Sequence, residues 1–281
     1  MIKNYLTVDV EDYFQVSAFE DIVGKDNWDN YPPRVVENTQ RILDLFDSYN
    51  VKATFFILGW VAERFPALVK EINARGHEIG CHSYYHRLVY DLTPDEFRED
   101  TRKTKDLLEQ LTGRKVLGYR APSYTITKRS LWALDILEEL GFAYDSSIFP
   151  IYHDRYGLPG APRFKYKMPD HDLTEYPIST SIIMGRKIPV AGGGYFRLFP
   201  YWFMRMALNK INVRERQPFI FYFHPWEIDP GQPRMKNSKP LSRFRHYINL
   251  QRTADRLRNL LRDFSFGPIT NNMQQGMQRQ P

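Results

Sequence analysis

Short apolar runs alternate along the chain with longer segments whose apolar residues recur at helical spacing. The short runs predict buried strands at residues 4–10, 53–58, 78–81, 116–119, 142–146, 176–179, 187–190 and 219–223. The longer segments predict helices at 35–49, 60–74, 93–113, 127–140, 201–212 and 243–262. Residues 149–172, rich in Pro and Gly, predict a loop, and residues 266–281 predict a disordered tail.

Repeated alternation of strand and helix predicts a parallel α/β fold, either a barrel or a doubly wound sheet. In both architectures the chemistry gathers at the carboxyl ends of the strands. Polar side chains occur at such positions along this chain: Asp9, Glu11, Asp12, His82, His86, Arg120 and His224. We therefore expect these side chains to meet in one site.

Two histidines and a group of carboxylates are candidate metal ligands. His82 and His86 are four residues apart, so both could reach one ion from one side of a helical turn. Asp9, Glu11 and Asp12 would repel one another unless a cation or a proton neutralises them. A solvated acidic loop is the alternative, but the apolar flanking residues disfavour it. Two histidines with one carboxylate suit a hydrolytic metal that keeps positions open for water and substrate.

Other residues are candidates for proton transfer or orientation. Arg120 could orient a carboxylate base or hold substrate, and a structural ion pair is an equal alternative. His224 could act as a general acid, although a lone His on an apolar strand is more often structural. Asp145 could orient a catalytic His or simply form a turn. The glycines at 192–194 allow a tight turn or close approach of a ligand, but they lack the Lys-Ser/Thr of a phosphate loop.

Composition narrows the classes of partner. The chain has 39 basic and 33 acidic residues, a net charge of +6, and no nucleic-acid-binding signature, so we expect no nucleic-acid partner. The basic segment 234–262 could dock an anionic, lipid-linked intermediate, but a solvated helix that packs on the barrel is favoured. A single cysteine, Cys81, excludes an internal disulfide. With neither a signal-like N-terminus nor a spanning apolar run, a cytoplasmic location is expected.

Taken in order, several motifs resemble the polysaccharide deacetylases of carbohydrate esterase family 4, which share the NodB homology domain. They more closely resemble the branch associated with exopolysaccharide gene clusters and the exosortase (PEP-CTERM) system, which carries a DUF3473-type extension. The motifs are residues 6–14 (LTVDVEDYF), 82–86 (HSYYH), 119–122 (YRAP), 144–147 (YDSS), 192–197 (GGGYFR) and 223–226 (FHPW).

This resemblance implies a distorted (β/α)7-type barrel. Residues 1–265 would form a single domain, with a family-specific part at about 150–265. The implied activity is the removal of N-acetyl groups, or sometimes O-acetyl groups, from polysaccharides by an enzyme that uses a divalent metal. Zinc is the expected ion, with cobalt or another divalent ion as the alternative. The implied substrate is a polysaccharide or a lipid-linked oligosaccharide of exopolysaccharide biosynthesis, which would allow peripheral contact with the inner face of the membrane.

The resemblance also implies roles for individual residues. They are Asp9 as general base, His82 and His86 as metal ligands, Arg120 as the group that orients the base, and His224 as general acid. Many members carry two adjacent Asp residues in the first motif, whereas Val10 follows Asp9 here. Glu11 and Asp12 therefore stay equal candidates for the metal carboxylate, and Asp145 is the candidate acidic partner of His224.

Two other functions stay open at this point. A non-catalytic glycan-binding module could retain the same fold, although the chain keeps every candidate metal ligand. A hydrolase of small cyclic amides or ureides is the second alternative, because relatives of the fold carry out that reaction. A long aromatic groove would favour the glycan, and a small closed pocket would favour the cyclic amide.

Overall fold

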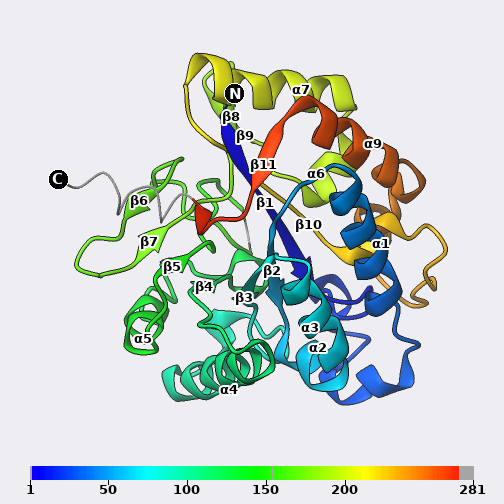
Figure 1. The fold of residues 1–281 in the computed structure, drawn as a ribbon, viewed down its shortest axis with the longest axis vertical. Helices are drawn as coiled ribbons and strands as arrows, with labels where there is room; N and C mark the ends of the chain where they lie inside the picture. The colour runs from blue at the N-terminus through cyan, green and yellow to red at the C-terminus, as the bar shows by residue number, and fades with distance from the viewer. Residues whose placement is uncertain (1, 154, 272–281) are drawn as a thin grey trace.

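The structure, a computed structural model, describes residues 2–153 and 155–271. Its central feature is a curled sheet with the strand order β10, β1, β2, β3, β4, β5, β7, β6, in which β11 also pairs with β1 (Figure 1). The pairs between neighbours are parallel except that of β6 with β7. The strands are β1 Lys3–Val10, β2 Thr54–Ile57, β3 Glu78–Cys81, β4 Gly118–Tyr119, β5 Tyr144–Asp145, β6 Tyr166–Lys167, β7 Thr174–Glu175, β10 Ile220–Phe223 and β11 Ser265–Gly267. A separate antiparallel hairpin consists of β8 Thr180–Ile183 and β9 Arg186–Pro189.

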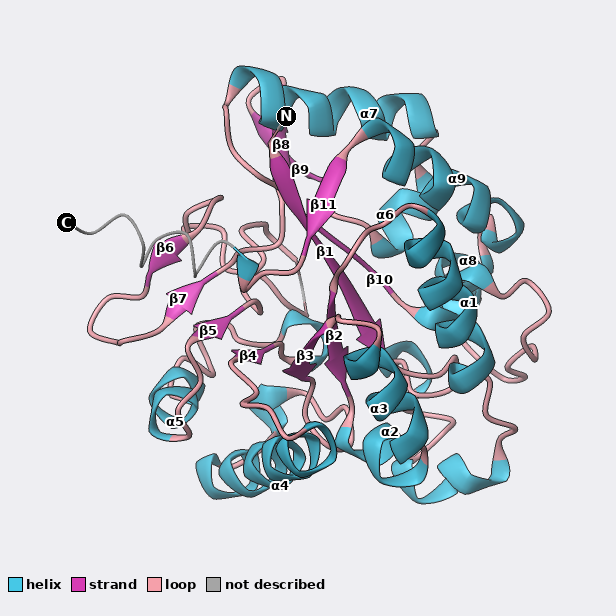
Figure 2. Ribbon diagram, viewed as in Figure 1, coloured by secondary structure: helices cyan, strands magenta, loops and turns pink. Residues whose placement is uncertain are grey.

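Helices surround much of the outside of this sheet (Figure 2). They are α1 Val35–Ser48, α2 Gly59–Arg64, α3 Pro66–Ala74, α4 Pro94–Thr112, α5 Ala133–Glu139, α6 Gly193–Leu198, α7 Tyr201–Asn209, α8 Pro240–Tyr247 and α9 Leu250–Asp263. Short 3-10 segments occur at Ser17–Phe19, Lys25–Asn30, Val89–Asp91, Pro122–Tyr124 and Pro225–Ile228, and a π-helical turn at Lys210–Arg214. The predicted α/β class is confirmed, with the sheet curled into a half-barrel.

The sheet is buried on both faces, which explains its uninterrupted apolar strands. Every residue of β1 after Lys3 is buried, as are all four residues of β2 and of β10. Successive side chains of a strand point to opposite faces, so Tyr5 and Asp9 share one face of β1. Tyr5 packs edge-on against Tyr176 there, with ring centroids 5.4 Å apart. Aromatic side chains thus fill the space below the carboxyl ends of the strands.

Local sequence signals predict some helix boundaries correctly and others wrongly. The capping box at the start of α4 forms as predicted, since Thr93 accepts a hydrogen bond from the N–H of Glu96 and Glu96 accepts one in return. The helix predicted at 60–74 is wrong as a single helix, because Pro66 begins a new one. The helix predicted at 243–262 is likewise divided at Asn249, whose φ of 53° lies in the left-handed region.

The expected tail from residue 266 is wrong for the part that the structure describes. β11 pairs with β1 in parallel, Phe266 is buried, and the N–H of Ile269 donates to Oγ1 of Thr54. Residues 272–281 lie outside the described residues. The basic segment at 234–262 includes α9, which buries Leu257 and Leu260, so this helix packs on the barrel as favoured. Within residues 2–153 and 155–271, no helix has the length and hydropathy needed to cross a membrane.

Candidate metal and catalytic site

Three candidate metal ligands converge at the carboxyl ends of β1 and β3. Glu11 follows β1 directly, His82 follows β3, and His86 lies in the loop after it. One ligand atom from each lies within 4.8 Å of the other two, and all three residues are buried. Oε2 of Glu11 lies 2.8 Å from Nε2 of His86 yet forms no hydrogen bond with any described residue. A buried carboxylate oxygen and imidazole nitrogens that face one point fit a divalent cation, with positions left open for other ligands.

The charge states of these residues suit metal binding. Burial lowers the pKa of His82 to about 4, so its imidazole is neutral at pH 7. Nδ1 of His82 lies 2.8 Å from the carbonyl oxygen of Arg120, which favours the tautomer with a proton on Nδ1 and leaves Nε2 free as a ligand. Although burial opposes ionisation of Glu11, His86 and His224 hold the pKa of this carboxyl well below its usual range.

Asp12 takes a different position, which decides between the two carboxylates that the sequence left open. Its Oδ2 accepts hydrogen bonds from the N–H groups of Arg34 and Val35, at 2.7 and 2.9 Å. Its Oδ1 accepts from the N–H of Tyr13 at 2.9 Å. Asp12 therefore fixes the start of α1, whose first N–H groups have no partner within the helix. Glu11, and not Asp12, is the carboxylate that groups with the two histidines in this structure.

The two histidines meet through a loop rather than through a helical turn. Ser83 and His86 both have positive φ, 61° and 55°, and no helix spans them. The N–H groups of Gly59 and Trp60 donate to the carbonyls of Ser83 and Tyr84, which ties this loop to α2. The ring centroids of His82 and His86 are 5.4 Å apart. The expected proximity is therefore correct, but the helical explanation for it is wrong.

Asp9 and Arg120 form a buried ion pair beside the three candidate ligands. Nη1 of Arg120 donates to Oδ1 of Asp9 and to Oγ1 of Thr7, both at 2.7 Å. Nε and Nη2 of Arg120 donate to the carbonyl and to Oγ of Ser146. Arg120 is fully buried and Asp9 nearly so. One side of the Asp9 carboxylate is thus held in place, while Oδ2 faces Nε2 of His224 at 3.9 Å.

His224 is oriented by Glu227, not by Asp145. Nδ1 of His224 lies 2.7 Å from Oε1 of Glu227, which leaves Nε2 facing Oε1 of Glu11 at 3.5 Å. Burial lowers the pKa of His224, but the charges of Glu11, Glu227 and Asp9 outweigh it and raise this pKa to about 9. Asp145 instead accepts a hydrogen bond from Oγ of Ser147. The expected pairing of Asp145 with His224 is therefore wrong.

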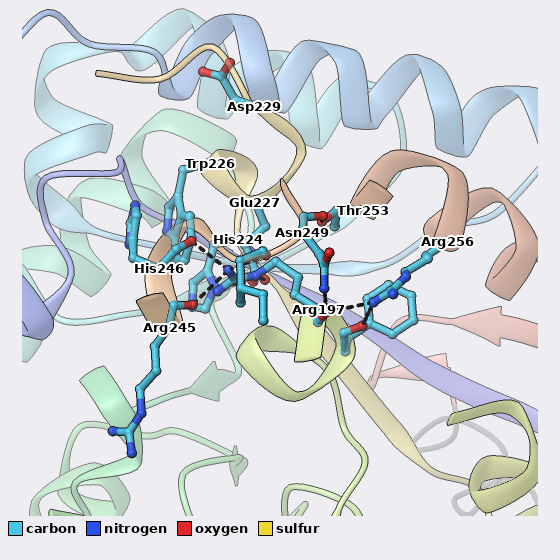
Figure 3. A network of polar contacts seen from close by, with 12 residues as sticks. Arg197, His224, Trp226, Glu227, Asp229, Arg245, His246, Asn249, Thr253 and Arg256 are labelled. Atoms are coloured by element: carbon cyan, nitrogen blue, oxygen red, sulfur yellow. Dashed lines mark hydrogen bonds and ion pairs between the residues drawn. The ribbon is translucent and has the colours of Figure 1, made fainter. Parts of the chain in front are cut away.

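Arg197 holds Glu227 from the other side (Figure 3). Nε of Arg197 donates to Oε2 of Glu227 at 2.6 Å. Its Nη1 donates to the carbonyls of Arg245, His246 and Ile248, at the end of α8. Burial raises the pKa of Glu227, but Arg197 and His224 outweigh burial and hold it below the usual value. A permanently charged guanidinium therefore keeps the partner of His224 ionised in a buried setting.

The glycines at 192–194 serve close backbone packing. Gly192 has a φ of 130°, and a Cβ there would lie 1.8 Å from the carbonyl oxygen of Tyr222. This close approach brings the start of α6 against β10 and so positions Arg197. This packing against the protein's own backbone is a third reason for glycine here, beside the expected tight turn and the expected approach of a ligand.

Family models match two adjacent regions of the chain. Residues 26–144 match the family model described as polysaccharide deacetylase. This region of the chain is therefore similar to the polysaccharide deacetylases. Residues 146–274 match a second model, described as a domain of unknown function, DUF3473. The two matches confirm the resemblance to polysaccharide deacetylases and the DUF3473-type extension.

Individual relatives match part of the chain. A peptidoglycan-N-acetylglucosamine deacetylase of Bacillus cereus is 42% identical over 101 residues, which are 36% of this chain and 37% of that protein. A peptidoglycan deacetylase of Helicobacter pylori is 33% identical over 121 residues, 42% of this chain and 40% of that protein. The chain thus spans about two fifths of the length of these curated relatives.

Solved structures resemble the whole fold. A presumed polysaccharide deacetylase of Mycobacterium smegmatis superposes with a TM-score of 0.61 at 20% identity, covering 99% of this chain and 91% of that one. The Bc1960 peptidoglycan N-acetylglucosamine deacetylase superposes with a TM-score of 0.51 at 20% identity, covering 96% and 86%. At this level of identity the likeness shows the shared deacetylase-type barrel.

The candidate site draws on both matched regions and on the residues before them. Asp9 and Glu11 precede the polysaccharide deacetylase match, His82 lies within it, and His224 and Glu227 lie within the DUF3473 match. The sequence interpretation had assigned no role to Glu227 or Arg197. Glu227 had a detectable signal, because it follows His224 by three residues, the spacing that lets a side chain reach back to that residue.

Proposed function

We propose that the protein is a metal-dependent hydrolase that removes N-acetyl groups from amino sugars. The proposed substrate is a polysaccharide or a lipid-linked oligosaccharide of exopolysaccharide biosynthesis, handled in the cytoplasm at the inner face of the membrane. The observation that carries the reaction type is the convergence of Glu11, His82 and His86, flanked by Asp9 and His224. The match of residues 26–144 to the polysaccharide deacetylase model, and a relative named as a peptidoglycan-N-acetylglucosamine deacetylase, support the substrate class.

The metal proposed for this site is zinc, with cobalt as the alternative. Glu11, His82 and His86 would hold it, since two imidazoles and one carboxylate leave open positions for water and substrate. Such a cation supplies Lewis acidity that polarises the acetyl carbonyl and makes water a better nucleophile. Among the described residues, this is the one group of three or more His, Cys, Asp or Glu side chains with ligand atoms this close.

Asp9 is the proposed general base. Its Oδ2 is available to accept a proton from the attacking water, because Arg120 occupies Oδ1. Arg120 also keeps the carboxylate in one orientation, through its contacts to Thr7 and Ser146. The attack on the acetyl carbon breaks the carbon–nitrogen bond, so the products are acetate and a free amino sugar.

His224 is the proposed general acid. Its Nε2 faces the same space as the carboxylates of Asp9 and Glu11, at 3.9 and 3.5 Å. The carboxylate of Glu227 at Nδ1 favours the protonated imidazolium, the form that can donate a proton to the leaving amine. Glu227 and Arg197 keep the ring oriented from behind.

Acetate release from N-acetylglucosamine oligomers tests the proposal. The wild-type protein should release acetate, lose this activity with EDTA, and regain it with added zinc or cobalt. His82→Ala should abolish both the activity and the bound metal, because it removes one of the three ligands. Asp9→Asn should reduce kcat by about 100-fold or more while metal content stays at the wild-type level.

Other outcomes separate the alternatives. Metal binding without acetate release from any oligomer would favour a different amide substrate, such as a cyclic amide. Oligomer binding without bound metal would favour a glycan-binding module. Near-wild-type activity of Asp9→Asn would show that the base is another group.

A further inference from the structure

Apolar side chains are unusually exposed on one face of the molecule, far from the candidate site. The face is formed by the hairpin β8–β9, by α7 and by the turn Lys210–Arg214, and we refer to it as the α7 face. Its apolar side chains with the largest exposed fractions are Met184 at 97%, Val213 at 72%, Trp202 at 67% and Met206 at 50%. They border a hollow of about 770 Å³. Large apolar side chains gathered in this way mark an interaction surface more often than scattered ones do.

The α7 face is the outer side of an amphipathic helix. Trp202, Met206 and Val213 recur at helical spacing on its exposed side. Met204, Leu208 and Ile211 are buried on the opposite side. Because Met204 and its neighbours already provide the packing of α7, the fold itself does not require an indole or a thioether on the outside.

The turn of the hairpin provides an independent observation. Met184 and Gly185 connect β8 to β9 as a two-residue turn, with φ of 50° and 75°. A turn with two positive φ values strongly favours Asn or Asp followed by Gly. Met at the first position carries a conformational cost and is almost completely exposed. A residue that is unfavourable for its backbone and unburied in the monomer points to a role outside the fold.

The charge of the α7 face indicates its partner. Arg205, Lys210 and Arg214 line the hollow together with the apolar residues, and none of the described residues that line it is acidic. The nearby Asp263 pairs with Arg205, and Glu215 pairs with Arg163. A second copy of the same face would bring these cations against each other. An anionic bilayer satisfies both features, because Trp and Met can enter the interface while Arg and Lys contact the headgroups.

We propose that the α7 face docks on an anionic lipid bilayer. This proposal does not depend on the proposed hydrolysis. Asn212, in the turn after α7, exchanges hydrogen bonds with Asn4 at the start of β1, whereas the candidate site lies at the other end of β1 (Figure 1). The docked protein would therefore turn the candidate site away from the lipid, and of the two proposed substrates this orientation favours a polysaccharide over a lipid-linked oligosaccharide.

Co-sedimentation with vesicles tests this proposal. The full chain should bind vesicles of phosphatidylglycerol and phosphatidylcholine but not vesicles of phosphatidylcholine alone. Trp202→Ser and Met184→Asn should each weaken binding by about tenfold, because each removes an apolar side chain from the interface. Phe244→Ser is the matched control, since Phe244 is also an exposed aromatic, at 56%, but belongs to α8. It should leave vesicle binding unchanged.

Further measurements distinguish loss of vesicle binding from loss of folding. Met184→Asn should raise Tm, because Asn suits the positive φ of the turn, so weaker vesicle binding cannot be attributed to unfolding. Acetate release from soluble oligomers should be unchanged in Trp202→Ser and Met184→Asn. The proposal is overturned if the anionic vesicles do not bind, or if both variants bind like wild type. A dimer in sedimentation velocity that Trp202→Ser dissociates would also overturn it, in favour of a second copy.

Discussion

Glu11 and Asp12 are adjacent in the chain, but their carboxylates have different neighbours and therefore different properties. Glu11 is surrounded by imidazoles, which hold the pKa of its carboxyl well below the usual range. Asp12 accepts three backbone hydrogen bonds, yet burial still raises its pKa to about 6. The side chain that follows β1 directly faces the candidate site, and the next one faces the start of α1. A one-residue difference in position thus separates a candidate ligand from a helix cap.

At the residue scale, Glu227→Gln tests how His224 is oriented. We expect kcat for acetate release to fall about 10- to 100-fold, because the neutral amide no longer stabilises the imidazolium. KM and metal content should change little, since Glu227 does not face the three candidate ligands. Steady-state kinetics and elemental analysis provide these readouts.

Asp145→Asn is the matched control for this experiment, because Asp145 is a buried carboxylate that contacts Ser147 instead of His224. Its kcat should stay close to the wild-type value. A large loss of kcat in Asp145→Asn together with a normal Glu227→Gln would show that the contact between His224 and Glu227 has no role in turnover.

At the element scale, the sequence located the elements better than it located their ends. The strand at Glu78–Cys81 and the cap of α4 agree with expectation, because both depend on residues close in the chain. The strand expected at 176–179 is wrong, since β7 ends at Glu175 and β8 begins at Thr180. Pairing with β5 and β9 decides these boundaries, and a pairing partner far along the chain leaves no local signal.

The pairing of β5 with β7 places two buried carboxyls side by side and predicts a pH dependence. Asp145 and Glu175 are register partners. Burial raises the pKa of Asp145 to about 6 and that of Glu175 well above its usual value. The native state therefore keeps protons that the unfolded chain releases above about pH 4. This contribution to the free energy of unfolding is present at low pH and is lost as pH rises through about 6.

Urea unfolding of wild type and Asp145→Asn between about pH 4 and 7 measures this effect. The variant lacks one of the two titrating groups. Its free energy of unfolding should therefore fall less than that of wild type as pH rises. The comparison uses the difference between the two proteins, because other carboxyls contribute equally to both. Parallel pH profiles would contradict the assignment.

At the scale of the whole molecule, the two ends of the described chain meet. β11 pairs with β1 at Lys3, Asn4 and Tyr5, and Phe266 packs edge-on against Phe219 beside β10. β1 is therefore bordered by strands from the beginning and from the end of the chain, β2, β10 and β11. The candidate site and the α7 face lie at opposite ends of β1.

Phe266→Ala tests this closure. The buried ring packs with Phe219 and Phe264, so its removal should lower the free energy of unfolding by about 3 kcal/mol. Phe244→Ala, which truncates an exposed ring on α8, should change it by no more than about 0.5 kcal/mol. Chemical denaturation provides both values. Equal stability of the two variants would show that residues 265–267 are not part of the core.

The sequence by itself determined the α/β class, the residues that follow the strands, and the resemblance to polysaccharide deacetylases. These features follow from local periodicity and from short motifs. Both can be recognised in the sequence without knowledge of the fold. The tertiary structure alone decided that Glu11 rather than Asp12 joins the histidines, and that Glu227 rather than Asp145 orients His224. It alone placed Arg197 behind Glu227 and gathered the exposed side chains of the α7 face. Except for the three-residue spacing of His224 and Glu227, these choices depend on which loops and strand ends become neighbours after packing, and such distances leave no local signal in the sequence.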